Sequence, residues 1–121
     1  FSPKRYSDTT SLIKHYLLSN EEDNSVTVTN LQDMTTLLML DNAAICYTDN
    51  QNERIWTITN QNSTECYDIK SGNLLFKLDG AYEILSDYDS GYALIRETES
   101  NQYMYVNEKG ESLKIVDNSV S

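Results

Sequence analysis

Two stretches of the chain share one hairpin pattern, and this repeat constrains the fold more than any other feature. The first stretch, residues 64–80, carries an apolar-rich run on each side of a polar turn. Gly72 lies in that turn and supplies the positive φ that a hairpin turn needs. The second stretch follows 38 positions later, where Tyr105 and Gly110 repeat the spacing of Tyr67 and Gly72. The sequence therefore predicts a chain built from repeated β-hairpins.

Short apolar runs separated by polar turns continue over most of the chain. Residues 26–29 alternate cleanly between valine and threonine, which is typical of a strand with one wet face. The predicted strands are residues 26–29, 35–40, 43–47, 54–59, 64–69, 73–78, 82–85, 92–96, 102–106 and 112–116. Turn signals every 8–12 residues favour an all-β sandwich, barrel or propeller-like arrangement. We expect an all-β fold, an antiparallel meander of about ten short strands.

The N-terminal part of the chain shows a different periodicity. Apolar residues at positions 12, 13, 16 and 17 have the spacing of one helix face, and helix-capping residues precede them at positions 7–10. The pattern predicts one short helix that ends by Ser19 and Asn20. We expect an arm with this helix over residues 1–24, a β domain over residues 25–117 and a tail over residues 118–121.

The charge balance bears on partners and not on the fold. The formal net charge is −10, and the acidic residues are spread along both halves of the chain. Such a field repels nucleic acid and anionic lipid surfaces, and it suits solubility or a basic protein partner. No apolar run approaches the roughly 20 residues of a transmembrane helix. We expect no nucleic-acid partner and no membrane insertion by this segment.

The residue types that carry chemistry are few. His15 is the only histidine, so a site with two histidine ligands is excluded. Asp87 and Asp89 suggest a calcium loop, but Gly91 comes one position too early for an EF-hand. No nucleophile elbow and no phosphate-binding glycine loop is present. The sequence predicts a protein that is not an enzyme, with no catalytic residue, metal or cofactor.

The two cysteines, Cys46 and Cys66, lie 20 positions apart on predicted strands. Their spacing fits no zinc pattern, and one pair cannot complete a four-ligand site. Two alternatives remain at this point. The cysteines form a disulfide if their strands are neighbours in an oxidising compartment, or they are two buried thiols.

Nine tyrosines make the chain unusually rich in this residue. Tyrosine and tryptophan are favoured at protein interfaces, and alternate aromatic residues on a strand share one face. The same residues also stabilise sheets by cross-strand packing, which is the alternative interpretation. The candidate interaction residues are Trp56, Tyr67, Tyr82, Tyr88, Tyr92, Tyr103 and Tyr105.

Three stretches resemble known β repeats. Residues 66–75, with the pair Tyr67 and Asp68 before a glycine turn, resemble the closing strands of a WD-type propeller blade. Residues 91–94 followed by 103–110 resemble the WG-type bacterial repeat, and a fainter correspondence of residues 44–58 with 93–106 has an offset of 48 or 49. The tyrosine and glycine hairpin is also similar to the end of a PepSY-type module of bacterial surface proteins. These resemblances imply interaction or regulation.

Two functions are expected from these features. The first is a non-catalytic protein-interaction module of a bacterial surface or extracytoplasmic protein, in which the tyrosine-bearing strands bind a protein partner. The alternative is a virion or other assembly subunit that locks to its neighbours through edge strands and the arm at residues 1–10, because terminal segments order on docking.

Overall fold

Twelve strands make up the described part of the chain, residues 9–21 and 24–114 of a computed structural model. The strands are β1 (Thr9–Ile13), β2 (Tyr16–Asn20), β3 (Ser25–Asn30), β4 (Thr35–Asp41), β5 (Ala43–Asp49), β6 (Arg54–Thr59), β7 (Ser63–Asp68), β8 (Leu74–Asp79), β9 (Tyr82–Ile84), β10 (Tyr92–Glu97), β11 (Tyr103–Asn107) and β12 (Ser112–Lys114). The prediction of an all-β fold is confirmed, and the ten predicted strands correspond to β3–β12.

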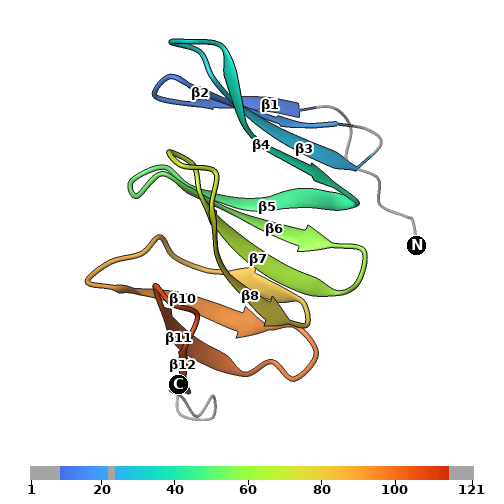
Figure 1. Ribbon diagram of the computed structural model, residues 1–121. Helices are drawn as coiled ribbons and strands as arrows, with labels where there is room; N and C mark the ends of the chain where they lie inside the picture. Colours follow the sequence, from blue (N-terminus) through green and yellow to red (C-terminus); the bar gives the residue numbers. More distant parts are fainter. Residues whose placement is uncertain (1–8, 22–23, 115–121) are drawn as a thin grey trace.

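The strands form three antiparallel sheets of four strands each, taken in chain order. The first sheet contains β1–β4, the second β5–β8 and the third β9–β12. Within each sheet every strand pairs with the next, so each sheet is a simple meander. Figure 1 shows the three sheets stacked one on another, with the second sheet in the middle.

The predicted N-terminal helix is wrong, because residues 9–20 form the hairpin β1–β2. Lys14 has a φ of 54° and turns the chain between the two strands. Ile13, Tyr16 and Leu18 are buried against the second sheet, whereas Leu12 faces outward. The apolar pairs flanking the turn have helix-like spacing in the sequence, but β2 pairs with β3 along its whole length and becomes part of the first sheet.

Strand pairing places one row of side chains at an equivalent position in all three sheets. Each row crosses the second, third and fourth strands of its sheet through directly paired residues. The rows are Leu18, Val28 and Leu38 in the first sheet, Trp56, Cys66 and Phe76 in the second, and Leu94, Tyr105 and Leu113 in the third. We call the sheet face that carries this row the forward face and the opposite face the backward face.

Residues with a left-handed backbone conformation recur at corresponding turns of the sheets. Asn24, Asn62 and Asn101 have φ values of 66°, 62° and 62° between the second and third strands of their sheets. Asparagine tolerates this conformation better than most residues. Gly72 and Gly110, the pair seen in the sequence, have φ values of 76° and 86° in the turns before the fourth strands. Spacings of 38 or 39 residues therefore mark one repeated unit.

The sheets pack forward face against backward face. The first core contains the forward row of the first sheet and Ile55, Tyr67 and Ile69 from the second sheet. The second core contains Trp56 and its row from the second sheet, with Ala93, Ile95 and Val106 from the third. Burial of these apolar side chains holds the stack together.

The turn glycine before the fourth strand of the second and third sheets lies against the preceding sheet. A Cβ atom built on Gly72 would lie 2.1 Å from the backbone oxygen of Leu37 in the first sheet. One built on Gly110 would lie 2.7 Å from Phe76 in the second sheet. The turn glycines are therefore needed for the positive φ and for the contact between sheets.

Strand pairing also corrects the residue correspondences expected from the sequence. Tyr105 lies at the position of Cys66 and not of Tyr67, because Tyr105 pairs with Leu94 and Leu113 as Cys66 pairs with Trp56 and Phe76. The fainter offset of 48 or 49 matches first strands with second strands, since residues 44–47 lie in β5 and residues 93–96 in β10. These two segments are not equivalent in the structure.

Candidate functional site: an open apolar sheet face

The forward face of the third sheet carries an apolar patch that no described residue covers. Leu113 is 54% exposed, and Tyr92 and Tyr105 are each 42% exposed, while Leu94 between them is half-buried. A hollow of about 510 Å³ lies over these side chains and is bordered by Ser86, Asp89 and Ser90. Contiguous exposed apolar surface on a small domain marks a binding surface more often than scattered single residues do.

Two tyrosines give the patch a rigid centre. The rings of Tyr92 and Tyr105 meet edge to face, with their centroids 6.3 Å apart and their planes at 69°. The two residues lie on the paired strands β10 and β11, and both point away from the second core. Tyrosine offers a large contact area with few rotatable bonds, which is why it is enriched at interfaces.

The forward face of the second sheet is covered by the third sheet, and it shows which side chains pack against such a face. There Trp56 stacks on Tyr88, which precedes β10, with the planes at 11° and the centroids 6.2 Å apart. Trp56 also meets Phe76 edge to face at 5.4 Å. Both Trp56 and Tyr88 are buried. Aromatic packing of this kind adds to the stabilisation from area burial.

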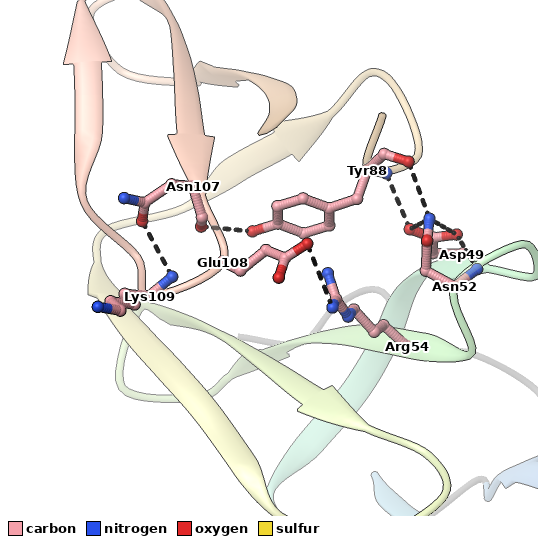
Figure 2. A network of polar contacts seen from close by, with 7 residues as sticks. All are labelled: Asp49, Asn52, Arg54, Tyr88, Asn107, Glu108 and Lys109. Atoms are coloured by element: carbon pink, nitrogen blue, oxygen red, sulfur yellow. Dashed lines mark hydrogen bonds and ion pairs between the residues drawn. The ribbon is translucent and has the colours of Figure 1, made fainter. Parts of the chain in front are cut away.

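A polar network beside this aromatic group ties the third sheet to the second (Figure 2). Asp49, at the end of β5, is fully buried and accepts a hydrogen bond from the backbone N–H of Tyr88 at 2.9 Å. Its carboxylate also accepts bonds from the backbone N–H and the side-chain amide of Asn52. The same amide donates to the carbonyl oxygen of Tyr88 at 2.8 Å. A buried carboxylate is tolerable only with such partners.

Arg54 extends the network across the tyrosine ring. Its guanidinium carbon lies 4.6 Å from the centroid of the Tyr88 ring, and its Nη2 lies 3.6 Å from the carboxylate of Glu108. The Tyr88 hydroxyl donates to the carbonyl oxygen of Asn107 at 2.8 Å. Figure 2 shows the ring lying between Arg54 and the turn that holds Asn107. Burial of this ring raises the pKa of Tyr88.

The third sheet has counterparts of these groups on its open face. Asp49 lies opposite Arg54 in the second sheet, and Asp89 lies opposite Tyr92 in the third. Asp49 is buried by the following sheet, whereas Asp89 and Tyr92 are exposed. The open face therefore combines an apolar row with a carboxylate at the position where the second sheet binds Tyr88.

The seven aromatic residues expected to mediate interaction are distributed over different environments. Trp56, Tyr67 and Tyr88 are buried, Tyr82 and Tyr103 are half-buried, and Tyr92 and Tyr105 are exposed. The hydroxyl of Tyr67 donates to the carboxylate of Glu65 at 2.6 Å, and burial raises the pKa of this phenol. The structure brings only Tyr92 and Tyr105 together with the hollow.

Sequence reasoning missed Leu94 and Leu113 as members of this face. Each lies at a strand position whose counterparts in the other sheets are buried, such as Trp56 and Phe76. The repeat of about 38 residues could have revealed them. A shift of 38 positions places Leu94 with Leu18 and Trp56, whereas alignment by the asparagine turns does not, because Asn62 and Asn101 are 39 positions apart.

The remaining chemical candidates lie apart from the open row. Both cysteines are free thiols, with Cys46 exposed and Cys66 buried, so the disulfide alternative is wrong. Strand β6 lies between their strands, which puts the two backbones about 10 Å apart, beyond the reach of a disulfide. The Tyr47 hydroxyl donates to the carboxylate of Asp87. In residues 9–21 and 24–114 there is no cluster of three or more potential metal ligands.

No protein-family model matches the chain, and no curated protein is significantly similar to it. Over the part of the chain that the structure describes, no helix is long and apolar enough to cross a membrane.

Proposed function

We propose that this protein is a non-catalytic interaction module that docks a protein partner on the forward face of its third sheet. The observation that carries the proposal is the equivalence of this face with two others in the same molecule. The forward faces of the first and second sheets are buried in the two cores, and the third alone is open among the described sheets.

The proposal is supported by the chemistry of the face. Tyr92, Tyr105 and Leu113 expose aromatic and aliphatic surface to water. Contact of apolar surface with water is unfavourable, and docking of a partner removes this surface from water. The row is uncharged although the chain has a net charge of −10. A depletion of charge at the centre of a patch, with tyrosine enriched, is the composition of an interface core.

We further propose that the three sheets are consecutive blades of a propeller-type repeat, as the WD-type and WG-type resemblances imply. A propeller blade is a four-stranded antiparallel meander, and blades pack face to face around a central axis. The three meanders here, their order and their repeat length of about 38 residues agree with this description. The forward face of the third sheet, which no described sheet covers, then presents a surface suited to another sheet.

The test is photo-crosslinking from inside the face. Tyr105 is replaced by p-benzoylphenylalanine, and the protein is irradiated in an extract of its native host. The control places the same group at Leu74, which is exposed on β8 and does not line the hollow. We expect an adduct from position 105 that disappears in a Leu113→Asp background, and none from position 74. Equal adducts from both positions, or none from position 105, would refute the proposal.

A second role, an assembly subunit, is favoured by one further observation. No described residue covers the backward face of the first sheet either, and this face exposes Leu12 and Met39. A chain with two different open faces at opposite ends of its stack of sheets can bind a neighbouring subunit at each end, as an assembly subunit must. The arm expected to mediate assembly, at residues 1–10, lies largely outside the described residues.

A further inference from the structure

We propose that the partner of the open forward face is a second copy of this chain, bound head to tail through the backward face of its first sheet. This inference rests on the proposed function, since it names the partner of the same face. It commits to a heterologous contact, in which two different surfaces of the chain meet.

The chain carries both halves of one type of contact. Each internal contact joins a forward face to the backward face of the following sheet. The third sheet leaves one forward face open, and the first sheet leaves one backward face open. A second copy placed like a fourth sheet would repeat a contact that the chain already makes twice.

The backward face of the first sheet has the pair that the second sheet uses in its contact. In the first sheet Leu17 and Thr29 pair directly and are half-buried. The equivalent pair in the second sheet is Ile55 with Tyr67, and both residues are buried beneath the first sheet. Leu17 and Thr29 therefore lie where the other sheets bury side chains against a preceding sheet.

Two large apolar side chains add to this face. Leu12 is 57% exposed and Met39 is 68% exposed, and both point away from the first core. The other strand residues of the face are threonine or serine at positions 10, 19, 25, 27, 29 and 36, and one carboxylate, Asp41, which pairs with Ser25 at the end of β4. Apart from this end the backward face is apolar and hydroxylic, and its centre suits the tyrosine and leucine row of the third sheet.

Leu12 lies where it would enter the contact between the two copies. Strand pairing puts Leu12 at the position that Tyr88 has in the third sheet, one residue before the pair that closes the first turn. Tyr88 covers Arg54 and Asp49 of the preceding sheet. In the complex, Leu12 of the second copy therefore covers Tyr92 and Asp89, the counterparts of those two residues.

Two copies of the chain supply enough sheets to close a ring. Two copies joined in this way bring together six four-stranded sheets, within the range of four to eight found in closed propellers. A ring of two chains uses both open faces of each chain and leaves none exposed. Met34 stands where Gly72 and Gly110 touch the preceding sheet. This turn must therefore lie farther from its neighbour, so the contact between chains is looser than the internal ones.

Sedimentation velocity over a range of protein concentrations tests the inference. We expect the intact chain to sediment with twice the mass of one chain. Leu113→Asp changes the forward face and Leu12→Asp the backward face, and each should raise the dissociation constant at least about tenfold. Leu74→Asp is the matched control, since it changes an exposed leucine outside both faces. Circular dichroism and the urea midpoint establish that each variant is folded.

A mixture of the two interface variants separates head-to-tail from face-to-face association. Each variant keeps the face that the other has lost, so the mixture should form a dimer at concentrations where neither variant does alone. A chain that is monomeric at all concentrations, or a dimer that Leu12→Asp leaves intact, overturns the inference. Added salt should strengthen the dimer, because it screens the repulsion between two chains of net charge −10.

The crosslinked peptide distinguishes failure of this inference from failure of the proposed function. Adducts from position 105 to residues 9–20 or 35–41 of this chain support the head-to-tail dimer. Adducts to a different protein, together with a monomer in sedimentation, leave the interaction role standing and refute the second copy as the partner. The absence of any adduct refutes both.

Discussion

Replacing Asp49 by alanine should destabilise the protein strongly, because this buried carboxylate joins the second sheet to the third. It accepts hydrogen bonds from the backbone N–H groups of Asn52 and Tyr88, each at 2.9 Å. Without the carboxylate, both N–H groups lose their acceptor. Leaving a buried donor unsatisfied costs about 1–3 kcal/mol. The two donors together give an expected loss of about 2–6 kcal/mol, a large fraction of the 5–15 kcal/mol typical of a domain.

The chain supplies its own matched control for this change. Asp89 occupies the equivalent position on the third sheet but is exposed, so Asp89→Ala should change the stability of the monomer by less than about 0.5 kcal/mol. Asp49→Asn keeps the size of the side chain and one acceptor oxygen. Its loss of unfolding free energy should fall between those of Asp49→Ala and Asp89→Ala. The assay is urea unfolding followed by tryptophan fluorescence, since Trp56 packs against Tyr88 beside the network.

These measurements belong in the Leu113→Asp background, where self-association does not contribute to the unfolding free energy. Equal losses of unfolding free energy for Asp49→Ala and Asp89→Ala would show that burial by the following sheet does not determine how much the carboxylate stabilises the protein. A loss below about 1 kcal/mol for Asp49→Ala would show that its hydrogen bonds contribute little net free energy. Either result would refute the view that this network holds the third sheet on the second.

Three further predictions follow from the packing and burial. In urea unfolding, Gly72→Ala should lower the free energy of unfolding by about 1–3 kcal/mol more than Gly91→Ala does. Both glycines have a positive φ, but only at Gly72 would a Cβ atom meet the backbone of the preceding sheet. Equal losses for the two variants would contradict this contact. Burial raises the pKa of Tyr47 to about 12, so the folded state keeps a proton that the unfolded chain loses near pH 10. Stability should therefore be complete below pH 10 and fall as the pH rises toward 12, and Tyr47→Phe should flatten the dependence of the urea midpoint on pH. Burial raises the pKa of Cys46 to about 11 and that of Cys66 to about 12, so exposure and not the pKa distinguishes the two thiols, and only Cys46 is exposed. A thiol reagent at pH 8 should label one cysteine in the native protein and two in urea, and rapid labelling of both would show that Cys66 is accessible.

The sequence by itself determined the class of the fold. Alternating apolar residues and frequent turn signals specify strands locally, because side chains of a strand point alternately to its two faces. Gly72 and Gly110 marked the turns before the fourth strands of the second and third sheets, since a positive φ restricts those positions to very few residue types. The repeat of 38 residues was visible for the same reason. These features depend on residues close together in the chain, and such features can be read without the structure.

Only the tertiary structure decided which side of each sheet is covered. The chain near Ile13 and Tyr16 has a spacing that suits a helix or a hairpin, and pairing of β2 with β3 selects the hairpin. Tyr88 is buried and Tyr105 exposed although both are tyrosines of the third repeat, because one faces the second sheet and the other faces away from it. Burial depends on what lies across a contact between distant segments, and a short sequence pattern does not contain that information.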